Sequence, residues 1–208
     1  MEDLVSLGFE FESDNSDPQH KITILEALKP HPHLETLRIG GHPTCSPKWL
    51  TSLEHLKCLN LIDCVYYEIL PPLGNLLPSL ESLEIWRWQS MKKVGHELLG
   101  IEEGKWKDPS QSSFVSFPKL KQLSFWDMDE WKEWEGSIPE DGSLQVMPSL
   151  RFLTLSNCEK LEGLPDFLRM IRLPTLSIRN CEILKQGCQK GTGKEWLKIS
   201  HIPNIQIE

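Results

Sequence analysis

One apolar spacing recurs along the whole chain: three apolar residues at positions i, i+3 and i+5. Leu150, Leu153 and Leu155 form a clear copy within the segment 147–165. In an extended segment, Leu153 and Leu155 point to one side and their immediate neighbours point to the other. One such unit cannot bury its own apolar residues, so the spacing predicts that copies stack. The other copies are Leu34, Leu37, Ile39; Leu56, Leu59, Leu61; Leu80, Leu83, Ile85; Leu120, Leu123, Phe125; Leu173, Leu176, Ile178; Ile202, Ile205, Ile207; and Leu4, Leu7, Phe9 as an eighth copy or the remnant of one.

The period of these copies identifies the fold class. Their middle residues lie 22 residues apart from 37 to 59, 24 apart from 59 to 83, and 23 apart from 153 to 176. Such steps fall within the roughly 20–29-residue period of leucine-rich repeats. The sequence therefore predicts an α/β repeat solenoid: a leucine-rich-repeat horseshoe with a concave parallel β-sheet and an irregular, loop-rich convex side. We expect residues 1–208 to form a single domain of seven to eight repeats, with a C-terminal cap at 193–208.

Two longer steps, of 40 residues from 83 to 123 and of 30 from 123 to 153, predict insertions near 86–116 and 127–146. Within the first, the apolar and small residues of 94–100 are expected to dock on the solenoid, whereas the polar stretch 102–113 is expected to be mobile. The second carries Trp131 and Trp134 among many acids. These rings either form an exposed binding ridge or cover the core, and we favour the cover because exposed Trp pairs promote aggregation.

Composition and charge exclude several classes. No stretch approaches the ~18 apolar residues that cross a bilayer, and the acidic start lacks the features of a signal peptide. With no N-x-[ST] acceptor either, we expect an intracellular chain, cytoplasmic with the nucleus as the alternative. The net charge of −8 and the absence of a basic cluster argue against nucleic acid as a partner. The acidity serves solubility or steers basic partners.

Neither the cysteines nor the C-terminal glycines predict chemistry. Cys64, Cys158 and Cys181 each follow the last apolar residue of a copy by three positions, which predicts buried, reduced thiols, and no C-x-x-C pair indicates a metal. The segment ending in Gly193 and Lys194 resembles a phosphate-binding loop but has Cys188 and Glu195 where Gly and Ser or Thr are required. No catalytic arrangement stands out. We therefore expect no enzyme activity, cofactor or metal.

The residues that alternate with the buried leucines predict the functional surface. On the concave side they include large aromatic and Arg side chains, the types enriched at binding hot spots. Trp86, Trp126 and Phe152 fall on three successive strands and are expected at or near one lateral column, flanked by Arg38 and Arg179. The alternative is that the insertions cover these rings. The candidate protein-binding residues are Arg38, Asn60, Glu84, Trp86, Gln122, Ser124, Trp126, Phe152, Thr154, Ser156, Ser177 and Arg179.

Several connecting phrases resemble the C-terminal leucine-rich-repeat region of plant intracellular nucleotide-binding immune receptors of the coiled-coil type. The phrases are LEALKPHPHLETLRI (25–39), LPPLGNLLPSLESLEI (70–85), VGHELLGI (94–101), FPKLKQLSFWDMDEWKEW (117–134), MPSLRFLTLSNCEKLEGLP (147–165) and GKEWLKISHIPNIQI (193–207). They span nearly the whole chain in the family's order. The chain lacks the family's nucleotide-binding module and coiled coil, so we expect a fragment, a truncated gene product or an isolated repeat region.

The resemblance implies a protein-recognition module that binds a pathogen effector, or an effector-modified host protein. In a full-length receptor, it implies contact with the nucleotide-binding domain that helps to hold the receptor inactive. A constitutive adaptor, such as the substrate arm of a ubiquitin ligase, is the alternative from another class. An amino-terminal F-box-like helical segment would favour the adaptor, and none is visible. We expect the isolated chain to be a monomer.

Overall fold

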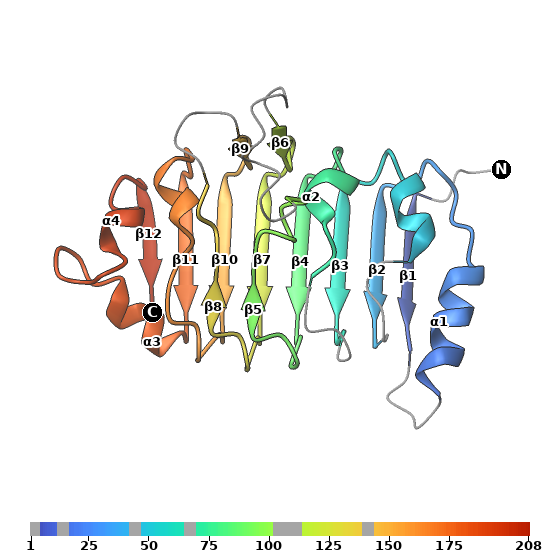
Figure 1. The fold of residues 1–208 in the computed structure, drawn as a ribbon, viewed down its shortest axis with the longest axis horizontal. Coiled ribbons are helices and arrows are strands. Elements are labelled where there is room, and N and C mark those ends of the chain that lie inside the picture. Colours follow the sequence, from blue (N-terminus) through green and yellow to red (C-terminus); the bar gives the residue numbers. More distant parts are fainter. Residues whose placement is uncertain (1–4, 12–16, 42–46, 65–69, 102–113, 139–143) are drawn as a thin grey trace.

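The computed structural model describes residues 5–11, 17–41, 47–64, 70–101, 114–138 and 144–208. Eight parallel strands form one open sheet in the order β1-β2-β3-β4-β7-β10-β11-β12 (Figure 1). Every neighbouring pair is aligned position for position, without a register shift. The strands are β1 (Ser6–Glu10), β2 (Thr36–Gly40), β3 (Cys58–Ile62), β4 (Ser82–Trp86), β7 (Gln122–Trp126), β10 (Phe152–Ser156), β11 (Thr175–Arg179) and β12 (Asn204–Ile207).

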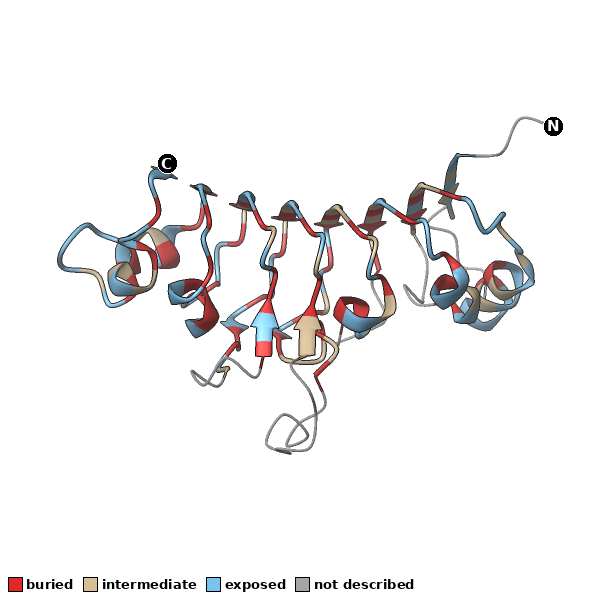
Figure 2. Cartoon of the chain, turned by 90° about the horizontal axis from the view of Figure 1, so that it is seen from above, coloured by how far each residue is buried: buried red, intermediate tan, exposed pale blue. Residues whose placement is uncertain are grey.

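The core lies on one side of this sheet. Seen from above, the strands line the concave side, and helices, turns and short strands form the opposite side (Figure 2). The second and fourth residues of the internal strands point into the core, as Leu37, Ile39, Leu153 and Leu155 show with at most 1% exposure. Each fully buried aliphatic side chain contributes about 1.5–3 kcal/mol. The predicted leucine-rich-repeat solenoid is confirmed.

Strands β3, β4, β7, β10 and β11 are each followed by a residue with left-handed backbone geometry. Asp63, Arg87, Asp127, Asn157 and Asn180 have φ values of 53°, 52°, 55°, 54° and 51°. Each backbone N–H donates to the last residue of the next strand or, for the final one, to Glu208. The side chains also join: Arg87 contacts Asp63 at 2.8 and 2.7 Å, Asn180 donates to Asn157 at 2.8 Å, and Asn157 donates to Asp127. We call this column the exit ladder.

Short helices and turns close the repeats on the convex side. Helix α1 (Pro18–Ala27) begins with the Asp17 carboxylate accepting from the Gln19 N–H at 3.0 Å, followed by Pro18 at the first helical position. Helix α2 (Leu73–Leu76) follows the proline pair at 71–72. A side chain at Gly74 would lie 2.4 Å from the Leu99 carbonyl oxygen, so this close approach requires glycine. The remaining helical turns are η1 (Lys48–Ser52), η3 (Asp166–Arg169), α3 (Glu182–Gly187) and α4 (Trp196–Ile199).

The two expected insertions are longer repeats that stack on one another. Strand β5 (Lys93–Val94) pairs in parallel with β8 (Glu133–Trp134), and β6 (Phe114–Ser116) pairs in parallel with β9 (Leu144–Val146). Val94, Leu98 and Leu99 are buried, so the predicted docking of 94–100 is confirmed. The stretch 102–113, expected to be mobile, lies outside the described residues.

Trp131 and Trp134 are buried, as the covering alternative predicted. The Trp131 ring lies 4.7 Å from that of Phe125, and Trp134 lies 6.2 Å from Phe167 in the next repeat. Trp131 Nε1 donates to the Glu133 carbonyl oxygen at 2.8 Å. These aromatic rings therefore fill the wide core of the longer repeats.

The cysteine prediction is partly wrong. Cys158 and Cys181 are buried free thiols, as expected. The hydrogen bond to Cys181 and the surrounding burial raise the pKa of Cys158, which keeps it protonated. Cys64 is also buried but is disulfide-bonded, so the expectation of a reduced thiol fails there. Its sequence position predicted the burial but not the bonded state.

The C-terminal segment folds around Glu195, one of the two residues that depart from the phosphate-binding loop. Glu195 is 6% exposed, and its Oε2 accepts from the Leu164 N–H at 2.8 Å and lies 3.0 Å from Lys198 Nζ. Lys198 also lies 3.2 Å from Asp166 and donates to the Leu164 carbonyl oxygen at 2.6 Å. A buried charge needs such partners. Glu195 therefore joins the tail to the preceding repeat.

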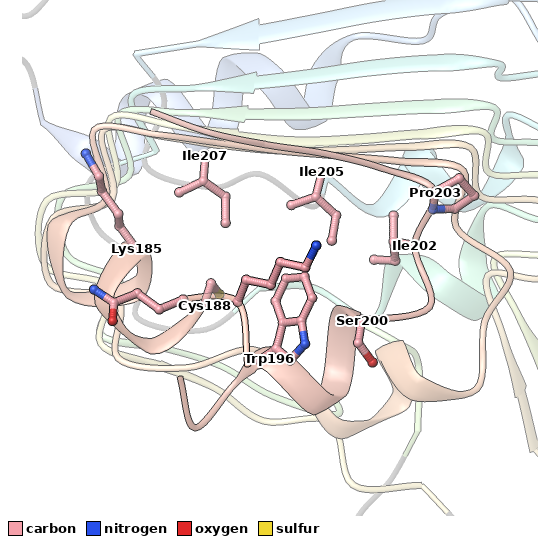
Figure 3. Close-up of a pocket in the computed structure, with 10 residues that line it drawn as sticks. Lys185, Cys188, Trp196, Ser200, Ile202, Pro203, Ile205 and Ile207 are labelled. Atoms are coloured by element: carbon pink, nitrogen blue, oxygen red, sulfur yellow. The ribbon is translucent and has the colours of Figure 1, made fainter. Parts of the chain in front are cut away.

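Trp196 packs against the core but is only half-buried. It borders a hollow of about 680 Å³ at the β12 end of the solenoid, into which Ile202, Ile205 and Ile207 project (Figure 3). Ile205 and Ile207 are half-buried, in contrast to the fully buried residues at the same positions of β11. Trp196 thus shields this end only in part.

Candidate protein-binding face

The concave face consists of three columns of side chains, because the strands are in register and alternate residues share a side. The first, third and fifth residues of each strand define what we call the first, middle and last columns. From β2 to β11 the first column holds Thr36, Cys58, Ser82, Gln122, Phe152 and Thr175. The middle column holds Arg38, Asn60, Glu84, Ser124, Thr154 and Ser177, and the last holds Gly40, Ile62, Trp86, Trp126, Ser156 and Arg179.

This register corrects the expected aromatic stripe. Trp86 aligns with Trp126, which aligns with Ser156, so both tryptophans occupy the last column. Phe152 aligns with Gln122 in the first column. Because four residues of a strand span about 13 Å, Phe152 lies far from the tryptophan column. The prediction of one shared column is therefore wrong for Phe152.

The two concave tryptophans form a stacked pair. Their ring centroids lie 4.8 Å apart with an interplanar angle of 9°, a separation that equals the spacing of neighbouring strands. Trp86 Nε1 lies 3.3 Å from Glu84 Oε2, and Gln122 Nε2 lies 3.4 Å from Glu84 Oε1. Both rings remain half-buried. The pair therefore presents apolar surface and is held by its polar neighbours.

Exposure divides the predicted site residues into three groups. Arg38 and Phe152 are exposed, the latter at 50%. Ser124, Ser156 and Ser177 are only 1%, 5% and 8% exposed, so the expectation that these serines are accessible is wrong. Small side chains between larger neighbours are shielded by them. The half-buried group is Asn60, Glu84, Trp86, Gln122, Trp126, Thr154 and Arg179.

Among the described residues, the buried side-chain nitrogen and oxygen atoms without a hydrogen-bond partner are Trp126 Nε1 and Ser177 Oγ. Both residues belong to the concave face. Leaving a buried polar group unpaired costs about 1–3 kcal/mol. Nearby, Arg179 Nε lies 3.6 Å from Glu208 Oε2, in a pair whose side chains are 42% and 68% exposed. The face thus combines an anchored aromatic pair with unused hydrogen-bonding capacity.

A row of charges at the start of the strands was not predicted from the sequence. Lys57 Nζ lies 2.6 Å from Glu35 Oε1, and Lys121 Nζ lies 2.7 Å from Glu81 Oε2. The hydrogen bond to Glu35 raises the pKa of Lys57, and that from Lys121 lowers the pKa of Glu81. The sequence contains this pattern, because the residues before β2, β3, β4 and β7 are Glu35, Lys57, Glu81 and Lys121, which alternate in charge. These four charges form two neighbouring ion pairs.

The described ranges contain neither a candidate membrane span nor a candidate metal site. No helix there combines the length and apolar character needed to cross a bilayer. No group of three or more His, Cys, Asp or Glu side chains there could hold a metal ion.

Comparisons with known proteins place the chain in a family. The profile described as R13L1/DRL21 LRRs matches residues 2–88. Relatives include a putative disease resistance RPP13-like protein 1 of Arabidopsis thaliana, 32% identical over 85% of this chain, and the putative disease resistance protein RGA4 of Solanum bulbocastanum, 34% identical over 76%.

The match covers only a small part of each relative. The chain spans 17% of the RPP13-like protein and 16% of RGA4. No solved structure matches. The repeat pattern, the open parallel sheet and these relatives agree: the chain belongs to the leucine-rich-repeat regions of plant disease-resistance proteins.

Proposed function

We propose that this chain is a non-catalytic protein-recognition module of an intracellular plant immune receptor, and that its concave face binds a pathogen effector or an effector-modified host protein. The observation that carries the proposal is the stacked, half-buried pair of Trp86 and Trp126 on that face. Tryptophan and arginine are enriched among the residues that dominate binding hot spots. The disease-resistance relatives support the immune role.

The proposed mechanism is a shift between two receptor states. In a full-length receptor, the repeat region would contact the nucleotide-binding domain and help to hold the resting state. A partner shifts such an equilibrium only by its differential affinity for the two states. Contacts at the concave face that exist only with the partner bound would supply that difference. The isolated chain would act as a cytoplasmic monomer with no nucleic acid partner.

The test is capture of a partner from pathogen-challenged plant extract by immobilised chain and by two variants. The first variant, Trp86→Ala with Trp126→Ala, removes the stacked pair. The second, Leu197→Ser, removes an apolar side chain that is 75% exposed but lies on helix α4 of the convex side. Circular dichroism checks that all three proteins are folded.

We expect a specific partner to be captured by the parent chain and by Leu197→Ser, and lost from the double variant. Equal capture by the folded double variant would contradict recognition through the tryptophan pair. A partner that also binds without challenge, together with ubiquitin-ligase subunits, would favour the adaptor function instead.

A further inference from the structure

The unpaired atoms Trp126 Nε1 and Ser177 Oγ lie on strands that flank β10. Trp126 occupies the last column of β7, and Ser177 occupies the middle column of β11. Ser177 is more than nine-tenths buried and lies on the concave side by strand alternation. An indole N–H can only donate, so its partner must bring an acceptor oxygen, whereas a serine hydroxyl accepts or donates. This part of the concave face therefore contains hydrogen-bond donors that a partner's acceptor oxygen could pair with.

A cation completes this patch. Arg179 follows Ser177 by two residues in β11 and occupies the last column, two strands from Trp126. Two strand spacings amount to about 10 Å, the span of a few residues of extended chain. The only ion pair of Arg179 among the described residues joins it to the exposed Glu208 at 3.6 Å. Because exposed pairs of this kind are weak, an incoming carboxylate can replace Glu208.

The patch also contains apolar surface. Phe152, half exposed on β10, lies between the strands that carry Trp126 and Ser177. Glu84 is a carboxylate of the middle column on β4, and it already accepts hydrogen bonds from Trp86 Nε1 and Gln122 Nε2. An extended ligand that runs along β10 thus meets donors and a guanidinium at the end of the strands and an aromatic ring about 13 Å away, at their start.

We propose that β7, β10 and β11 form a subsite for an extended partner segment that carries an Asp or Glu and, about four residues away, an apolar residue. The carboxylate pairs with Arg179 and accepts from Trp126 Nε1 or Ser177 Oγ, and the apolar residue packs on Phe152. Both unpaired atoms are shielded in the free chain, so binding includes rotation of the indole and the hydroxyl about their side-chain bonds. This subsite rests on the proposed recognition function and defines the chemistry of its partner.

The test uses a phage-displayed library of short random peptides, selected on the folded chain, followed by titration of the enriched peptides. Arg179→Gln removes the cation, Trp126→Phe removes the indole donor but keeps an aromatic ring, and Ser177→Ala removes the hydroxyl. Arg169→Gln is the matched control, because Arg169 is an exposed arginine on η3 of the convex side, outside the concave face.

We expect enrichment of peptides with a carboxylate about four residues from an apolar residue. Their Kd should rise about tenfold or more in Arg179→Gln and about threefold in Trp126→Phe and Ser177→Ala, with no change in Arg169→Gln. No enrichment, enrichment without acidic residues, or an equal loss in Arg169→Gln would overturn the proposal. If the plant partner still depends on the tryptophan pair, such a result would remove this subsite alone and leave the recognition function standing.

Discussion

Two pairs of tryptophans in this molecule have opposite surroundings. Trp86 and Trp126 stack on the concave face and stay half-buried, whereas Trp131 and Trp134 lie in the core of the longer repeats. The concave pair shares one column of two neighbouring strands, and its rings are nearly parallel at 9°. Of the core pair, Trp131 lies at the turn after β7 and Trp134 lies in β8, and the planes of their two rings make an angle of 52°. Position relative to the buried leucines, rather than residue type, separates the two environments.

We therefore expect the two pairs to contribute differently, the core pair to folding stability and the concave pair to partner binding. A core tryptophan stabilises the fold through the area that it buries, and its N–H is satisfied inside the chain. A tryptophan on the sheet surface contributes less to folding and keeps its free side for a partner. The same substitution at a core tryptophan and at a concave tryptophan should therefore lower the free energy of unfolding by different amounts.

The largest effect is expected at Trp131. This ring is fully buried against Phe125 and Trp134. Trp131→Ala should lower the free energy of unfolding by about 3–5 kcal/mol, because it leaves a cavity. Urea unfolding followed by circular dichroism measures this loss. A decrease below about 1 kcal/mol would mean that the ring is not part of a packed core.

A smaller loss is expected at Glu195. Glu195→Ala leaves the Leu164 N–H without its acceptor and removes one of the two carboxylates near Lys198. An unpaired buried group costs about 1–3 kcal/mol. The matched control is Glu182→Ala, which removes an exposed carboxylate and should change stability by less than about 0.5 kcal/mol. Equal effects in the two variants would contradict a structural role for Glu195.

The exit ladder predicts an intermediate effect at Asn157. Asn157→Ala removes the side-chain bonds to Asp127 and Asn180 and places alanine at a φ of 54°. We expect a loss of about 1–2 kcal/mol in urea unfolding. Asn157→Gly loses the same bonds but adopts this backbone geometry freely. It should therefore be less destabilised than the alanine variant, and the reverse order would contradict the ladder.

The smallest effect is expected for the concave tryptophans. Trp86→Ala removes a ring that is half-buried and whose stacking with Trp126 is worth about 0.5–1.5 kcal/mol. Unfolding experiments should show a loss near that range, well below the loss in Trp131→Ala. A loss of comparable size would place the concave pair with the core and weaken the comparison.

Much of this arrangement could be predicted from the sequence, because the repeat spacing determines which side each residue faces. The column of each aromatic residue can also be predicted from the sequence. Trp86 and Trp126 each follow the last apolar residue of their copy, whereas Phe152 precedes the middle residue of its copy. The prediction of one shared column for Trp86, Trp126 and Phe152 rested on their being in successive strands, not on their positions within the copies, and it is therefore wrong for Phe152.

Other features depend on neighbours that the sequence does not identify. Ser124, Ser156 and Ser177 face the concave side, but their burial is set by larger side chains on adjacent strands. The pairing of β5 with β8 joins segments 40 residues apart, from Lys93 to Glu133, within repeats of unequal length. The aromatic contacts across those repeats follow from this pairing, so no single copy could reveal them.

The most direct test is the affinity of the captured partner for three folded proteins: the parent chain, the variant with Trp86→Ala and Trp126→Ala, and Trp131→Phe. The last keeps an aromatic ring in the core and controls for altered packing. We predict that the double substitution weakens binding about tenfold or more and that Trp131→Phe leaves the affinity unchanged. Unchanged affinity in the folded double variant, or an equal loss in Trp131→Phe, would contradict recognition by the concave pair.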